Sequence, residues 1–111
     1  MNREARVRKT KASAGRKARK ELYVLRLYVA GLTTRSRTAI SNITSICEEH
    51  LQGRYDLEVI DVFQRPILAR EEQIIATPTL VKKLPAPLRR LIGDLSERQK
   101  VLIGLDLRRL G

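Results

Sequence analysis

Residues 22–30 read LYVLRLYVA, a nearly continuous apolar run that is rich in β-branched and aromatic side chains. Such a run is typical of a strand that is covered on both faces, as in a parallel sheet. Gly31 ends the run. The hydroxyls of Thr33 and Thr34 can then accept hydrogen bonds from the free amides of a first helical turn. The stretch therefore predicts a buried strand that leads directly into a helix.

The segment after this strand predicts that helix and a second strand. Gly53 is a C-terminal stop for the helix, and residues 57–63, LEVIDVF, predict the second strand. Strand, helix and strand in succession form a βαβ unit with a right-handed crossover, so we predict an α/β fold. The apolar side chains that recur at helical spacing on one face of residues 35–51 are Ile40, Ile43, Ile46, Cys47 and Leu51.

The second half of the sequence gives weaker signals. A short helix is expected over residues 67–75, after Pro66, and a strand over residues 79–83. Pro85 and Pro87 then break the chain.

The last apolar segment can be read in two ways. Ser96 and Gln99 have the spacing of a capping box, which predicts a helix through Leu110. Residues 100–107, KVLIGLDL, also alternate as in a strand, and Gly104 costs a helix about 1 kcal/mol relative to Ala. Helix and strand both stay open here, and this conflict indicates local frustration.

The first twenty residues differ from the rest in charge. They carry nine Lys or Arg and one Glu, whereas residues 21–111 carry fourteen basic and eleven acidic residues, within a net charge of +11. Large apolar side chains are almost absent from the first twenty, so burial cannot offset the entropy of ordering them. We predict a disordered basic arm over residues 1–20 and one folded domain over residues 21–111.

Three roles of the arm stay open: a solvated tail, a contact with nucleic acid or another anionic surface, and a transit peptide. No apolar run is long enough to span a membrane. Cys47 is the single cysteine, which excludes an internal disulfide and fits a reducing, cytoplasmic location.

The order of elements and the Thr-Pro-Thr at residues 77–79 are similar to thioredoxin, but the redox chemistry is missing. A thioredoxin needs two thiols as Cys-x-x-Cys at the start of its first helix. Residues 31–36 read GLTTRS, without sulfur, and Cys47 is expected to be an inert core residue. His50 is expected to interact with a helix dipole. With no Ser-His-Asp set or phosphate loop, we expect no enzyme activity, cofactor or metal.

Charged side chains cluster around the prolines of the second half. A solvated surface and a contact with an acidic partner or phosphate both stay open for this basic patch, which comprises Lys82, Lys83, Arg89 and Arg90. The adjacent pairs Glu48-Glu49 and Glu71-Glu72 are expected to lie on solvated faces, because neighbours on a helix do not converge.

Five motifs follow one another in order: YVLRLYVAG at 23–31, YDLEVIDV at 55–62, ATPTL at 76–80, LIGDLS at 91–96 and VLIGLDL at 101–107. Together they resemble the KaiB family of circadian clock proteins over about residues 22–107. On this resemblance the chain is identified as a member of that family.

The resemblance implies an adaptor with two folds. The second half is then expected to switch between a thioredoxin-like fold and the KaiB ground-state fold, in which the chain forms a dimer or tetramer. The thioredoxin-like monomer is expected to bind a KaiC-like hexameric ATPase ring and to regulate its phosphorylation and ATPase cycle. KaiA and a SasA-like kinase are the further partners that the resemblance implies.

The resemblance also assigns roles to particular residues. Basic positions implicated in KaiC contact match Lys82 and Arg89. Positions that control the switch match Tyr23, Gly104 and Asp106, and prolines that change isomer with the fold match Pro78 and Pro87.

Several residues depart from the family pattern. Ala86 stands where clock proteins often carry a third proline, and Glu58 and Gln73 replace lysines. The basic arm is an addition. These departures imply a divergent paralogue or a relative outside the core clock, in a circadian or stress-timing system. The alternative function is a nucleic-acid- or ribosome-associated protein that acts through residues 1–20.

Overall fold

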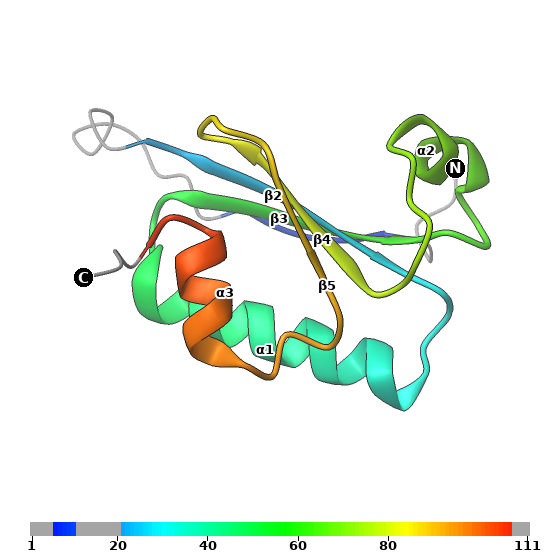
Figure 1. Cartoon of the computed structure of the whole chain (residues 1–111), viewed down its shortest axis with the longest axis horizontal. Helices are drawn as coiled ribbons and strands as arrows, with labels where there is room; N and C mark the ends of the chain where they lie inside the picture. Colours follow the sequence, from blue (N-terminus) through cyan, green and yellow to red (C-terminus); the bar gives the residue numbers. More distant parts are fainter. Residues whose placement is uncertain (1–5, 11–20, 108–111) are drawn as a thin grey trace.

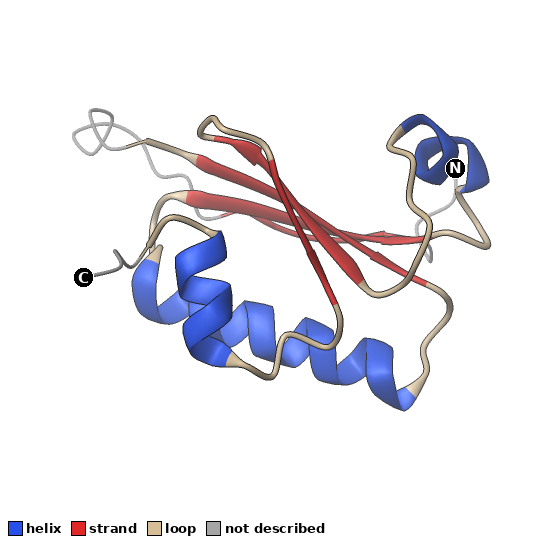
Figure 2. Cartoon of the chain, in the orientation of Figure 1, coloured by secondary structure: helices blue, strands red, loops and turns tan. Residues whose placement is uncertain are grey.

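The computed structural model describes residues 6–10 and 21–107. Five strands form one mixed sheet in the order β1-β3-β2-β4-β5, with three helices packed against it (Figure 1, Figure 2). The elements are β1 (Arg6–Thr10), β2 (Tyr23–Val29), α1 (Thr34–His50), β3 (Tyr55–Asp61), α2 (Pro66–Glu71), β4 (Thr79–Leu84), β5 (Arg89–Ile92) and α3 (Arg98–Gly104).

The predicted βαβ unit forms the centre of the sheet. Strands β2 and β3 run parallel, and β4 adds to the other side of β2 in the antiparallel sense. Helix α1 connects β2 to β3, and its N-cap is Thr33, whose side chain accepts a hydrogen bond of 3.1 Å from the backbone N–H of Ser36. The first half of the chain thus confirms the prediction.

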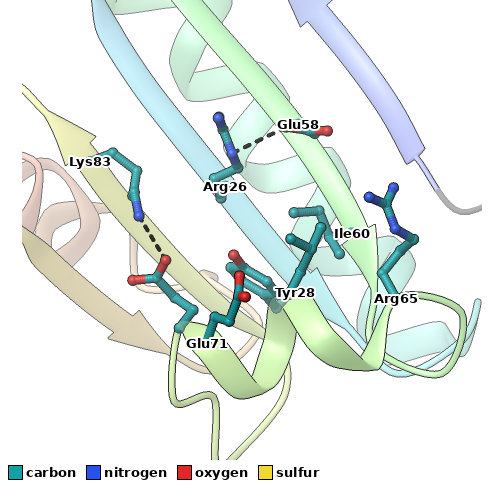
Figure 3. Close-up of a pocket in the computed structure, with 9 residues that line it drawn as sticks. Arg26, Tyr28, Glu58, Ile60, Arg65, Glu71 and Lys83 are labelled. Atoms are coloured by element: carbon teal, nitrogen blue, oxygen red, sulfur yellow. Dashed lines mark hydrogen bonds and ion pairs between the residues drawn. The ribbon is translucent and has the colours of Figure 1, made fainter.

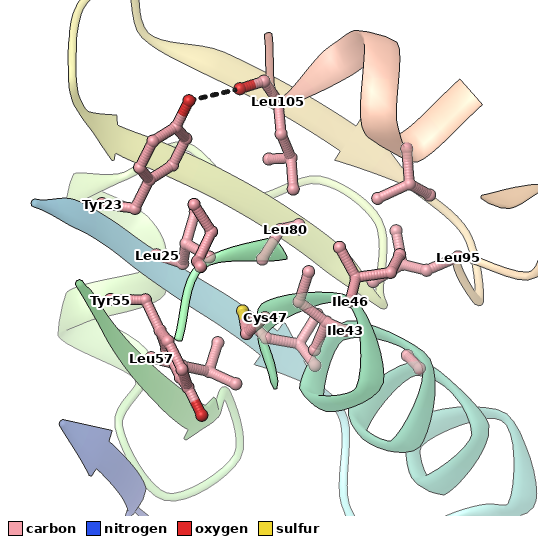
Figure 4. Close-up of a cluster of buried hydrophobic side chains, with 14 of the residues drawn as sticks. Tyr23, Leu25, Ile43, Ile46, Cys47, Tyr55, Leu57, Leu80, Leu95 and Leu105 are labelled. Atoms are coloured by element: carbon pink, nitrogen blue, oxygen red, sulfur yellow. Dashed lines mark hydrogen bonds between the residues drawn. The ribbon is translucent and has the colours of Figure 1, made fainter. Parts of the chain in front are cut away.

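The main core lies between the sheet and the helices α1 and α3 (Figure 4). Ile43, Ile46 and Cys47 of α1 are at most 1% exposed and face Leu25 and Leu57 of the two central strands. Burial raises the pKa of the Cys47 thiol to about 12, so the sulfur stays protonated at neutral pH. Cys47 is therefore the buried residue that the sequence predicts.

The opposite face of the sheet is covered at one end by α2 (Figure 1). Leu68 and Ala69 of this helix pack on a small cluster formed by Tyr28, Ile60 and Val81. In the described part of the chain, no helix has the length and apolar character needed to cross a membrane.

Two details of the last helix differ from the prediction. The prediction of a capping box is wrong, because α3 begins after Glu97 without a side-chain cap. The backbone N–H of Ser96 donates instead to Asp94 Oδ1 at 3.0 Å. Helix was predicted through Leu110, but α3 ends at Gly104, because Asp106 has a positive φ of 62° and ends the helical path. The strand alternative for residues 100–107 is also wrong.

Helix α2 is shorter than predicted for a similar reason. It ends at Glu71, and Gln73 has a positive φ of 59°, so the chain turns away before residue 75.

The strand β1 lies within the predicted disordered arm. Arg6–Thr10 pairs antiparallel with β3, and the remaining residues of the arm lie outside the described residues. The structure therefore differs from the prediction for these five residues. The physical reason is that pairing with a sheet edge uses backbone hydrogen bonds and does not require apolar side chains.

Candidate functional site

The end of α3 brings together residues that are far apart in the sequence. Tyr23 begins β2, Lys82 and Arg89 are directly opposite each other on β4 and β5, and Gly104 and Asp106 end α3 and follow it. We name these five residues the α3-end cluster. It contains three of the five residues predicted to control the switch and both residues predicted to contact a partner.

Lys82 is the buried centre of this cluster. Its side chain is 0% exposed, and its ammonium donates to Asp106 Oδ2 at 2.6 Å. Lys82 does not lie at the surface, as the predicted basic patch requires. Its side chain points to the face of β4 on which α3 lies, where it meets Asp106. In this conformation a direct contact between its ammonium and a partner is not available, whereas Arg89 is 47% exposed.

The carboxylate of Asp106 forms ion pairs with two side chains, Lys82 and Arg89. Arg89 Nη2 lies 3.3 Å from Asp106 Oδ1, and Arg89 Nε lies 3.4 Å from Oδ2, the oxygen that also accepts from Lys82. The hydrogen bonds from Lys82 and then from Arg89 lower the pKa of Asp106 below its usual range. Asp106 therefore connects the residues after α3 to both strands of the β4–β5 hairpin.

Tyr23 connects β2 to the same place. Its hydroxyl donates to the carbonyl of Leu105 at 3.1 Å (Figure 4). The Tyr23 ring lies 5.9 Å from the Lys82 ammonium and 5.8 Å from the Arg54 guanidinium, within the range of cation–π attraction. Burial is the main cause that raises the pKa of the Tyr23 hydroxyl, which therefore stays a donor at neutral pH.

Gly104 allows α3 to approach the hairpin closely. A Cβ atom at this position would lie 2.5 Å from Leu91 Cδ2 and 3.1 Å from Leu91 Cδ1. Leu91 packs against the main core from β5. Any larger residue at 104 therefore requires the Leu91 side chain to move.

A second acidic clamp lies on the opposite face of the hairpin. Glu72, just after α2, accepts from Lys83 at 2.7 Å and lies 3.4 Å from Arg90. Its side chain is 14% exposed, so the predicted solvated face is wrong for Glu72. All four residues of the predicted basic patch are thus ion-paired. Successive strand residues point to opposite faces, so Lys82 and Lys83 meet different acids, Asp106 and Glu72.

This second clamp borders an open, charged cleft of about 470 Å³ (Figure 3). Arg26 and Glu58 form an ion pair of 3.1 Å along its floor, and Arg65 and Glu71 lie at its edge. Positive and negative groups alternate around the cleft, so it has no net preference for an anion or a cation.

Pro78 and Pro87 lie outside the α3-end cluster. Both follow cis peptide bonds, as does Pro85. Pro78 directly precedes β4, and its carbonyl accepts a hydrogen bond of 2.9 Å from the backbone N–H of Gly93. Pro87 lies in the β4–β5 turn. Their role in switching stays a prediction.

An exposed apolar surface lies where the chain leaves the C-terminal ends of β2 and β3. Leu32, Phe63, Ile67 and Ile75 are between 63% and 92% exposed, and we name them the apolar end surface. Their segments leave the same end of the sheet (Figure 1). This surface was not predicted from the sequence, although large apolar residues in the connections between elements are a signal for it.

Two features shape the apolar end surface. Asp61 Oδ1 accepts from the amides of Gly31 and Phe63, at 3.3 and 2.9 Å, and so fixes the turn that carries Phe63. A groove of about 440 Å³ lies beside Ile75, lined by Val62, Pro66, Ala69, Ile74 and Arg70. The surface can therefore bind an apolar side chain next to a cation.

Solved structures place this architecture in the thioredoxin fold. The N-terminal domain of SasA from Synechococcus elongatus has a TM-score of 0.66 at 23% identity, covering 90% of this chain and 97% of that domain. Chloroplastic thioredoxin z has a TM-score of 0.64 at 22% identity, covering 81% of each chain. These similarities define a protein of the thioredoxin fold.

The particular family follows from sequence. The KaiB domain family matches residues 26–107. The circadian clock oscillator protein KaiB of Microcystis aeruginosa is 59% identical over 88 residues, which cover 79% of this chain and 85% of that protein. The circadian clock oscillator protein KaiB1 of Synechocystis is 58% identical over 88 residues, which cover 79% of this chain and 84% of that protein. The chain belongs to the KaiB family, as the sequence motifs indicated.

Replacing Lys82 by methionine should raise the pKa of Asp106. The depressed pKa means that the pair stabilises this conformation above the usual carboxyl pKa and that this contribution is lost as pH falls through the lowered value. Lys82→Met removes the hydrogen bond from Lys82, which is the largest cause of the lowered Asp106 pKa, and keeps the weaker contribution of Arg89. Carbon-13 NMR of the Asp106 carboxyl across acidic pH measures the change. Lys83→Met is the matched control, because Lys83 pairs with Glu72, and an equal shift in both variants would contradict the assignment.

Gly104→Ala should disturb the packing of Leu91 specifically. The added methyl group overpacks the contact, which typically costs about 1–3 kcal/mol, against a helix-propensity gain of about 1 kcal/mol. Shortening the neighbour as well, in Gly104→Ala/Leu91→Ala, should remove the conflict and give a favourable coupling of about 1 kcal/mol. Urea unfolding of the four proteins in the double-mutant cycle measures it. Strictly additive free energies would show that Leu91 does not constrain residue 104.

Proposed function

We propose that this chain is a non-enzymatic adaptor that binds a KaiC-like hexameric ATPase ring and regulates its phosphorylation and ATPase cycle in a circadian or stress-timing system. One combined observation carries this proposal. A member of the KaiB family, close in sequence to circadian clock oscillator proteins, has here the fold of the SasA N-terminal domain. Two clock proteins with one architecture can present the same surface to one partner, which supports a SasA-like kinase as a competitor.

A non-enzymatic role is supported by what occupies the thioredoxin redox position. The turn before α1 carries Leu32 and Thr33 instead of thiols, and Cys47 is buried with a raised pKa. A thiolate is the reactive form in disulfide chemistry, so this sulfur is poorly suited to it. Leu32 of the apolar end surface thus lies where a thioredoxin would carry its thiols.

The apolar end surface is the proposed docking site for the ring. Phe63 and Ile75 are 74% and 92% exposed on segments at one end of the sheet, and large exposed apolar residues are typical of interaction surfaces. Arg70 lines the same groove and supplies a cation beside them. A ring surface with an apolar pocket and a nearby carboxylate fits this chemistry. Lys82 and Arg89 lie away from this surface and act indirectly, because both pair with Asp106 and so hold the β4–β5 hairpin to the residues after α3.

The fold switch belongs to the same proposal. A ring that binds only the thioredoxin-like conformation shifts the population by its differential affinity for the two folds. The apparent affinity is reduced by the fraction of competent protein. The α3-end cluster joins β2, the hairpin and α3 through Tyr23, Lys82 and Asp106. We propose that this cluster stabilises the binding-competent fold, and that dimers or tetramers hold the other fold in the cytoplasm.

The docking proposal is tested with Phe63→Ser/Ile75→Ser and an ATP-loaded KaiC-like ring, with binding followed over hours. Burying one large apolar side chain contributes about 1.5–3 kcal/mol, so losing two should weaken binding at least about tenfold.

Leu88→Ser is the matched control. Leu88 is 49% exposed in the β4–β5 turn, away from the apolar end surface, so its loss should leave binding unchanged. Equal binding by all three proteins would refute the docking surface. Failure of the unmodified chain to bind any ring with ATP would refute the function itself.

A further inference from the structure

The strand β1 is an element that lies outside the part matched to the family. The KaiB domain match begins at residue 26, whereas β1 spans Arg6–Thr10. It pairs with β3 along five consecutive residues, from Arg6 opposite Ile60 to Thr10 opposite Asp56. Among the described strands, β1 thereby takes the outer edge of β3 that the KaiB-family domain would leave open (Figure 1).

The backbone register pairs residues of opposite charge in the sequence. Arg8 is directly opposite Glu58, and on its other side Glu58 is paired in register with Arg26, whose Nε lies 3.1 Å from the Glu58 carboxylate. Glu58 is 2% exposed. Residues of opposite charge at directly opposite register positions favour the pairing of two strands. An acidic residue in the centre of β3 therefore selects a basic strand for this edge.

The connection between β1 and β2 has more residues than the distance between the two strands requires. Thr10 is opposite Asp56 and Tyr23 is opposite Tyr55, so β1 ends and β2 begins at the same end of β3. The two strands flank β3, which separates them by about 10 Å. The twelve residues from 11 to 22 can reach about 40 Å when extended. The strand can therefore leave the edge and return without disturbing β2.

We propose that the outer edge of β3 is a docking site for an extended basic segment, and that Arg6–Thr10 occupies it as a displaceable cap. An open strand edge pairs readily with another chain. The cap closes this edge to added strands for as long as it is paired, and a competing extended segment gains access only when the cap leaves.

The pairing is tested in the full chain with Val7→Pro/Arg8→Pro. Adjacent residues of an antiparallel strand alternate between hydrogen-bonded and non-hydrogen-bonded positions, so two adjacent prolines remove at least one ladder donor. Ser13→Pro/Ala14→Pro is the matched control outside β1. Hydrogen exchange measured by NMR should show at least tenfold faster exchange for the β3 amides that point away from β2. The β3 amides that bond to β2 should stay protected, which shows that the fold is intact.

Docking is tested by adding the peptide MNREARVRKTKASA, which copies residues 1–14, at millimolar concentration. It should restore protection of the same outward amides in Val7→Pro/Arg8→Pro and should have no effect on the unmodified chain. The charge selection is tested with Arg8→Glu against Lys17→Glu, which changes the net charge equally; only the first should speed the exchange. Unchanged exchange in the proline variant, no rescue by the peptide, or equal effects of both charge reversals would overturn the proposal.

Discussion

The buried ammonium of Lys82 is the constraint on which the second half of the fold depends. A charge removed from water is costly unless it is paired and hydrogen-bonded. In this conformation the partner is Asp106, 2.6 Å away, with the face of Tyr23 on another side. The chain after α3 must therefore return to the hairpin, and α3 must end where Asp106 can reach Lys82. The positive φ of Asp106 and the close approach at Gly104 are consequences of this requirement.

The same constraint relates the residues predicted to control switching to the proposed binding surface. Tyr23, Gly104 and Asp106 lie at one end of the sheet, whereas the apolar end surface is formed by connections that leave the C-terminal ends of β2 and β3 (Figure 1). Strand β4 runs between the two regions, with Lys82 in the first and with Pro78 beside the second. A change in the position of β4 and β5 would therefore affect both the α3-end cluster and the apolar end surface, without a long chain of intervening contacts.

The sequence was sufficient for the first half of the fold because the period of its apolar residues changes clearly from strand to helix and back. It was insufficient for the second half, where the residues of α3 are consistent with helix and strand alike and tertiary contacts decide. The motif match found Tyr23, Gly104 and Asp106, but it could not show that Lys82 is internal. An isolated lysine in a strand carries no sign of the face it takes until its acid, 24 residues later, is placed. The pairing of Arg6–Thr10 was missed because composition does not report backbone bonds to a sheet edge.

The most direct test of the account is nitrogen-15 NMR of the lysine ammonium groups in the thioredoxin-like form, bound to a KaiC-like ring. The account predicts a slowly exchanging Lys82 ammonium signal with a hydrogen-bond correlation to the Asp106 carboxyl carbon, while the 78% exposed Lys100 exchanges rapidly. A Lys82 signal that exchanges with water as fast as that of Lys100 would contradict the buried pair and the role assigned to it.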